Sequence, residues 1–104
     1  MHTFDVFGKP CNRLHIPGIS KCDFKIRKRI SIDSLYPNQQ YLCDAELKTK
    51  LSGKRHTVPY VLCLEDKNIL FDGHHTTAAK KIKGQKYIMA LCYELKYCNE
   101  EGQS

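Results

Sequence analysis

A glycine that joins a strand-like run to a helix-like run constrains this chain more than any other feature. Residues 69–72 are typical of a strand, and residues 74–83 are typical of a helix entered at Gly73 and ended at Gly84. Two further apolar runs, at 58–64 and 87–97, are typical of buried strands. Strands that alternate with helices pack as layers around one core. The sequence therefore predicts a mixed α/β (α+β) fold.

Residues 24–33 alternate between apolar and polar side chains, which is the pattern of a half-buried strand. The apolar face, which we expect to be buried, carries Phe24, Ile26, Ile30 and Ile32. The outer face is cationic and carries Lys25, Arg27 and Arg29. We expect these three cations to contact nucleic-acid phosphates, because basic surfaces attract polyanions.

The connection between the first two strands contains a turn and a helix. Pro37 and Asn38 predict a turn within residues 36–40. Residues 44–52 predict a short helix with Asp44 as its N-cap and Gly53 at its end. The full order of elements predicts a small single domain, in which a mixed sheet is flanked by short helices.

Chain length and composition set the domain organisation. A chain of 104 residues is long enough for one domain. Residues 1–23 contain several glycines and prolines and predict an irregular arm, whose apolar residues could still pack on the domain. Residues 24–98 are the expected domain and residues 99–104 a short tail. No apolar run approaches the length that spans a membrane, and no leader for export is visible at the start.

The six cysteines are interpreted as reduced thiols of a cytoplasmic protein. The chain has no CxxC spacing of the kind found in zinc sites, and Cys63 and Cys92 lie within apolar runs, where a thiol behaves as a small buried hydrophobe. A disulfide or metal role for some of them stays open. The formal charge of +6 favours polyanionic partners, with simple solubility as the alternative.

The start of the helix after Gly73 is the candidate functional site. A helix start presents unpaired N–H groups and the positive end of the dipole, so it can bind an anion. The predicted phosphate-binding residues are Gly73, His74, His75, Thr76, Thr77 and Lys80. Asp72 is the adjoining carboxylate, a candidate for catalysis or magnesium binding. The alternative is a purely structural turn, and the adjacent histidines lack the i, i+4 spacing of a metal site, so no metal ligands are predicted.

The segments ISIDSLYPNQQYL and ILFDGHHTTAA resemble the N-terminal domain of ParB proteins, in the ParB/sulfiredoxin superfamily. Pro37 and Asn38 match the start of a "PNP" turn, and Gly73, His74 and His75 match the start of a "G-H-H-R" box that opens a helix. The resemblance implies that nucleotide phosphates bind at this box. Its relatives include CTP-hydrolysing DNA clamps, free-serine kinases, ATP-dependent sulfiredoxin and nucleases, so the implied cofactor is a nucleoside triphosphate with Mg²⁺.

The sequence departs from these relatives where they carry catalytic or phosphate-clamping groups. Thr76 replaces the usual arginine of the box, which removes a bidentate phosphate clamp. His74 stands where sulfiredoxin has its nucleophilic cysteine, and Gln39 and Gln40 stand where the kinases have an acidic residue. We therefore expect binding without strong catalysis.

Three functions follow from these observations. The first is a stand-alone ParB-like module that binds a nucleotide or nucleic acid, such as an accessory protein of a phage or mobile element. The second is a nucleotide hydrolase, phosphotransferase or nuclease with His74, His75 and Asp72 as catalytic residues. The third is a basic module that binds an acidic protein partner. The first is favoured, because the box is present and the catalytic groups of its relatives are missing.

Overall fold

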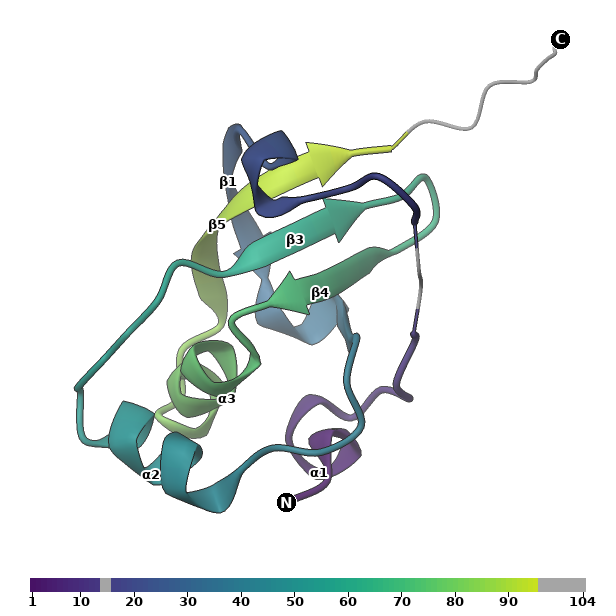
Figure 1. Ribbon diagram of the computed structural model, residues 1–104. Helices are drawn as coiled ribbons and strands as arrows, with labels where there is room; N and C mark the ends of the chain where they lie inside the picture. Colours follow the sequence, from purple (N-terminus) through teal and green to yellow (C-terminus); the bar gives the residue numbers. More distant parts are fainter. Residues whose placement is uncertain (14–15, 96–104) are drawn as a thin grey trace, which may run out of the picture.

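The computed structural model describes residues 1–13 and 16–95 and has an α+β fold, as predicted (Figure 1). A five-stranded mixed sheet has the order β1-β5-β3-β4-β2. Its strands are β1 (Ile26–Ser31), β2 (Leu35–Pro37), β3 (Tyr60–Cys63), β4 (Asn68–Asp72) and β5 (Tyr87–Glu94). The helices are α1 (Thr3–Phe7), α2 (Asp44–Leu51) and α3 (His74–Ile82), with 3₁₀ turns at Lys21–Asp23 and Ile32–Ser34.

Strand pairing in the sheet is mixed. β5 lies between β1, to which it is antiparallel, and β3, to which it is parallel. β3 and β4 form an antiparallel hairpin, and β2 pairs in parallel with β4 at the opposite edge. Since β4 runs directly into α3, the N-terminus of that helix lies where the sheet meets the helical layer (Figure 1).

The helices cover one face of the sheet and enclose the larger core. Side chains from the strands and from all three helices meet there, among them Phe7, Leu47, Val61, Leu70 and Cys92. α3 contributes the small residues Ala78 and Ala79, which are fully buried. Small side chains let the helix lie close to the sheet, which holds its first turn firmly beside β4.

The other face of the sheet is partly covered by the N-terminal arm. Phe24, Leu62 and Ile69 are buried there, and Ile16 and Ile19 of the arm pack against them. The arm also contains α1, whose Phe7 is 2% exposed within the main core. Residues 3–7 form a helix, so the prediction of an irregular arm is wrong there. The expected packing of apolar arm residues is confirmed for Val6, Phe7 and Ile16, whereas Phe4 is 51% exposed.

The first predicted strand differs from the observed one in its start and in two residues of its apolar face. Phe24 precedes β1 and is buried on the face opposite to Ile30 and Ile32. β1 begins at Ile26, and the side chain of Ile26 is 43% exposed, where the alternation predicted burial. β1 is an edge strand, and Ile26, its first residue, pairs with Cys92, which lies toward the end of β5 rather than at the start that follows α3. An alternating pattern predicts the face of the sheet on which a side chain lies. Whether that side chain is buried depends on whether another layer covers that part of the sheet.

Two details of the following connection also differ. Pro37 belongs to β2, which the sequence did not predict, and the expected bend comes after it, at residues 38–40. A proline is tolerated there because β2 is an edge strand. The N-cap of α2 is Cys43 rather than Asp44, and Asp44 instead pairs with the N-terminal ammonium of Met1 at 3.1 Å.

The cysteines agree with the expectation of buried, free thiols. Cys63 and Cys92 are buried in the sheet, and all five cysteines of the described residues are free. Burial raises the pKa of the Cys92 thiol to about 12, which makes it unreactive. The last strand ends at Glu94, before its predicted end at residue 97. Residues 96–97, Cys98 and the tail at 99–104 lie outside the described residues. No helix in the described ranges is long and apolar enough to cross a membrane.

Candidate functional site

A pocket of about 650 Å³ lies at the start of α3. Five of the residues singled out in the sequence line it, namely Asp72, Gly73, His74, His75 and Thr76. The opposite walls come from the 3₁₀ turn, the connection after β2, α2, and the segment that leads into β3 together with its first residue. Their lining residues are Lys21, Gln39, Glu46, Lys50, Thr57, Val58 and Tyr60. The fold therefore brings four separate parts of the chain around the predicted helix start.

Gly73 makes the sharp turn from β4 into α3, and no other residue suits its position. Its φ of 85° lies in the left-handed region, which side chains with a Cβ rarely adopt. A Cβ at this position would lie 2.8 Å from the Cα of Pro59. The turn thus depends on glycine both for its backbone angle and for the close approach of the segment before β3.

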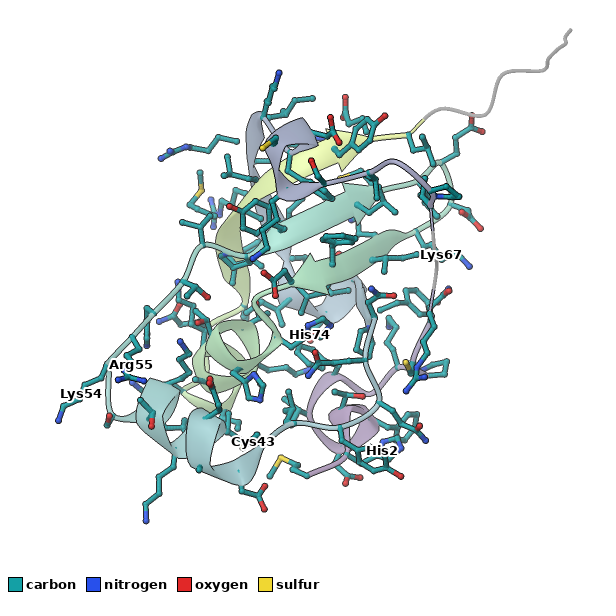
Figure 2. All side chains as sticks on the ribbon, in the orientation of Figure 1. His2, Cys43, Lys54, Arg55, Lys67 and His74 are labelled. Carbon is teal, nitrogen blue, oxygen red and sulfur yellow. The ribbon has the colours of Figure 1, made fainter. Side chains whose placement is uncertain are left out.

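His74 is buried and faces the connection between β2 and α2 (Figure 2). Its Nε2 accepts a hydrogen bond from the Asn38 N–H at 2.9 Å. Burial lowers the pKa of His74 to about 4, and the negative charge of Asp72 and a hydrogen bond to the Leu70 backbone oppose this only in part. The ring is therefore neutral at pH 7 and has both nitrogens engaged.

His75 holds the same connection at a second point. Its Nε2 accepts from the Cys43 N–H at 2.9 Å, next to the start of α2. Partial burial lowers the pKa of His75, and the negative charge of Glu46 opposes the shift. The two adjacent histidines point in different directions, as expected on a helix, yet both accept backbone hydrogen bonds from residues 38–43. They shape one wall of the pocket and, as acceptors, cannot donate from Nε2 to a phosphate.

The hydroxyl groups of Thr76 and Thr77 make hydrogen bonds within the protein and are buried. The Thr76 hydroxyl accepts from the Thr57 N–H at 3.1 Å and is 1% exposed. The Thr77 hydroxyl donates to the Gly73 carbonyl at 2.9 Å and is fully buried. Neither Thr77 nor Lys80 lines the pocket, although both were predicted as phosphate-binding residues. The Thr77 side chain is buried in the core, away from the pocket.

Cations and carboxylates alternate around the pocket. Lys21 pairs with Asp72 at 2.6 Å and lies over the Tyr60 ring at 5.4 Å from its centroid. Partial burial raises the pKa of Asp72, but hydrogen bonds from Lys21 and the Gly73 N–H outweigh it and bring that pKa below its usual value. Lys50, 7% exposed, donates to the Arg55 carbonyl. Lys21 and Lys50 are therefore two cations of the pocket that an anionic ligand could contact.

The cationic strand residues form a separate surface. Lys25 and Arg27 are exposed, and the Arg29 guanidinium lies 4.2 Å from the centroid of the Tyr87 ring. None of these three cations lines the pocket. The structure thus separates the two predicted sites, which the sequence could not place relative to each other.

The pocket also has lining residues that the sequence did not single out, namely Lys21, Glu46, Lys50, Thr57, Val58 and Tyr60. Lys21 lay in the segment interpreted as an arm, and Lys50 is one of several lysines near the end of a helix. No local spacing distinguishes them, because their position depends on how distant segments fold together. Among the described residues, no group of three His, Cys, Asp or Glu side chains could hold a metal ion.

Comparison with known proteins gives a structural likeness alone. No protein-family model matches the chain, and no curated protein matches it. The crystal structure of protein Atu1540 from Agrobacterium tumefaciens resembles it with a TM-score of 0.55 and 27% sequence identity. The two proteins share a fold over the part of each chain that the match covers. The match covers 68% of this chain and 39% of that chain, so this chain spans well under half the length of the other protein.

Proposed function

We propose that this chain is a ParB-like phosphate-binding module, which takes a nucleotide or a nucleic-acid phosphate in the pocket at the start of α3. One observation carries the proposal: the first turn of a nine-residue helix lines a pocket that also contains Lys21 and Lys50. The first bond within α3 runs from the Thr77 N–H to the Gly73 carbonyl. The N–H groups of His74, His75 and Thr76 precede it and are the expected phosphate donors.

The pocket has the size and chemistry that a nucleotide requires. Its volume of about 650 Å³ falls within the range of small-molecule sites, roughly 300–1,000 Å³. Val58 and Tyr60 supply apolar surface beside the two lysines. Asp72 and Glu46 could hold a Mg²⁺ that arrives with a triphosphate, since Mg²⁺ typically takes one or two protein carboxylates together with substrate phosphates.

Binding without strong catalysis fits the state of the candidate catalytic groups. A His74 with a pKa of about 4 and both nitrogens bonded is a poor general base near neutral pH. Asp72 is held as an ion pair with Lys21. A hydrolase, phosphotransferase or nuclease that used these residues would first have to break contacts that hold the pocket together.

Membership of the ParB/sulfiredoxin superfamily is part of this proposal. The relatives place an arginine where this chain has Thr76, whose side chain is buried against Thr57. We propose that Lys21 and Lys50, from other parts of the chain, supply the positive charge that this arginine would bring. Lysines bind phosphate as point charges, without the planar bidentate geometry of arginine.

The test is a calorimetric titration with the four common nucleoside triphosphates and with inorganic triphosphate. We expect the parent to bind at least one of them, and Lys21→Gln to weaken that binding roughly 10- to 100-fold, the usual effect of losing a hydrogen bond to a charged phosphate. Lys25→Gln is the matched control, because Lys25 is an exposed lysine outside the pocket. A parent that binds none of these ligands, or equal losses in both variants, would contradict the proposal.

Asp72→Asn tests the same pocket with an effect of opposite sign. Without Mg²⁺, the substitution removes a negative charge beside the phosphate and frees Lys21 from its ion pair. We therefore expect tighter binding of inorganic triphosphate in metal-free buffer. Weaker metal-free binding would mean that Asp72 itself recruits the ligand, which an anion pocket does not explain.

A further inference from the structure

The pairing of β1 with β5 places two arginines and two large side chains on one side of the sheet. Arg29 is opposite Met89, Arg27 is opposite Leu91, and Ser31 is opposite Tyr87. Directly paired residues of an antiparallel ladder project to the same face. The alternate residues, including Ile30 and Ile88, are buried in the helix-covered core. Arg27, Arg29, Tyr87 and Met89 therefore project from the face that the helices do not cover.

The N-terminal arm covers only part of this face. The arm packs on the cluster around Phe24, Leu62 and Ile69, which includes residues of β3 and β4. Tyr87 and Met89 remain 49% and 52% exposed, and Val58, just before β3, is 52% exposed. Figure 1 shows β1 and β5 side by side along this part of the sheet. Hereafter the β1–β5 face means Arg27, Arg29, Val58, Tyr87 and Met89.

The β1–β5 face combines positive charge with flat apolar surface. The Arg29 guanidinium stacks over the Tyr87 ring at 4.2 Å from its centroid. Arg27, Val58 and Met89 line a shallow groove of about 90 Å³ beside it. The two strands contain one carboxylate, Glu94, which pairs with Lys28 at 2.7 Å on the helix-covered side. Nothing within these strands neutralises the two arginines.

We propose that the β1–β5 face binds single-stranded nucleic acid. Bases would stack on Tyr87 and lie against Met89 and Val58, while Arg27 and Arg29 contact the phosphates. Aromatic rings beside a cationic groove are the usual platform for single strands, because every base has a stacking face and no sequence code is needed. Duplex bases are already stacked on one another and cannot use such a platform. The two sites share Val58, which borders both the groove and the α3 pocket, whereas Tyr87, Met89 and both arginines lie outside that pocket. The proposal stands whether or not the pocket binds a nucleotide.

The same chemistry argues against self-association through this face. A twofold interface would bring Arg27 and Arg29 of one copy toward the same residues of the other, since an isologous contact uses one patch twice. Like charges at close range disfavour that arrangement. A polyanion instead meets both arginines with opposite charge and offers its bases to the apolar residues.

The test is fluorescence anisotropy with labelled single-stranded DNA and RNA oligonucleotides of about 12 nucleotides, within the usual site size of stacking platforms. Tyr87→Ala should weaken binding about 5- to 150-fold, the range for loss of one base–aromatic stack. Tyr41→Ala is the matched control, because Tyr41 is an exposed tyrosine, 62% accessible, outside the face. Arg27→Gln should weaken binding and reduce its dependence on salt.

Each other outcome overturns the proposal. A parent that binds neither oligonucleotide, or a Tyr87→Ala protein that binds as tightly as the parent, excludes base stacking on this face. Tighter binding of the duplex than of the single strand would mean that the face attracts phosphates by charge alone, without base stacking. Concentration-dependent dimers in sedimentation that Tyr87→Ala abolishes would mean that the face joins two copies. Tyr87→Ala should leave the affinity for inorganic triphosphate unchanged, since Tyr87 does not line the α3 pocket, and this result separates the two sites.

Discussion

At the scale of the residue, the two histidines of the DGHH segment act first on the protein itself. Each accepts one backbone N–H from the connection between β2 and α2 through Nε2. The sequence predicted their place at the head of a helix and their divergent directions. It could not predict their partners, Asn38 and Cys43, because those contacts join residues more than thirty positions apart in the chain.

The low pKa of His74 makes the stability of the fold depend on pH. With a pKa of 6.5 in the unfolded chain and about 4 in the fold, His74 binds a proton more readily when unfolded. Its contribution to stability is therefore fully present above pH 6.5 and is lost as the pH falls toward 4. The loss over this window should be about 3 kcal/mol.

Urea unfolding at several pH values between 7 and 4 measures this effect. In the parent, the free energy of unfolding should fall as the pH falls, and His74→Gln should show a shallower slope, whatever its stability at pH 7. Partly exposed His75 remains in both proteins and contributes in the same direction. Equal slopes in the two proteins would mean that His74 titrates normally in the fold.

At the scale of the element, the strand, glycine and helix from 69 to 84 could be predicted closely. The glycines that bound the helix, together with the apolar run before it, are local signals. β2 and α1 could not be predicted in this way. β2 has three residues, one of them Pro37, and α1 has five, so neither shows a full period of its pattern. Both are stabilised by long-range contacts, such as the pairing of β2 with β4.

Two glycine substitutions separate backbone strain from close packing at the turn. Gly73 and Gly84 both have positive φ, at 85° and 91°. A Cβ at Gly84 meets nothing within 4 Å, whereas at Gly73 it meets the Pro59 backbone. Gly84→Ala should cost about 1–2 kcal/mol from strain alone. Gly73→Ala should cost about 1–3 kcal/mol more, from overpacking.

Chemical unfolding of the two variants supplies the measurement. The excess loss of stability in Gly73→Ala over Gly84→Ala is the energy of the close approach between the turn and Pro59. Equal losses would show that the segment before β3 moves away freely, and the wall of the pocket that it forms would then be adjustable rather than fixed.

At the scale of the whole molecule, the N-terminal arm is part of the domain. The interpretation of residues 1–23 as an irregular arm treated glycine and proline as signs of irregular structure. In the fold they separate short packed segments, which reach both faces of the sheet through Phe7 on one side and Ile16 and Ile19 on the other. Such contacts leave no periodic pattern, because each segment contributes only one or two apolar residues. The arm also contains Lys21, which lines the pocket.

Phe4 and Phe7 provide a matched pair for testing the arm, since both lie in α1. Phe7 is 2% exposed and Phe4 is 51% exposed. Phe7→Ala should lower the free energy of unfolding by about 3–5 kcal/mol, as for other buried phenylalanines. Phe4→Ala should change it by less than about 0.5 kcal/mol. Thermal and urea unfolding report both values, and a tolerated Phe7→Ala would mean that the domain is stable without its arm.

The central claim is that phosphate binds at the first turn of α3, and backbone amide shifts of ¹⁵N-labelled protein test it most directly. During titration with inorganic triphosphate, the largest saturating shifts should fall on the N–H groups of His74, His75 and Thr76, with Lys25 and Arg27 unaffected. Those shifts should be absent in Lys21→Gln at the same ligand concentration. Shifts confined to exposed lysines and arginines, with the first turn of α3 unchanged, would contradict the claim.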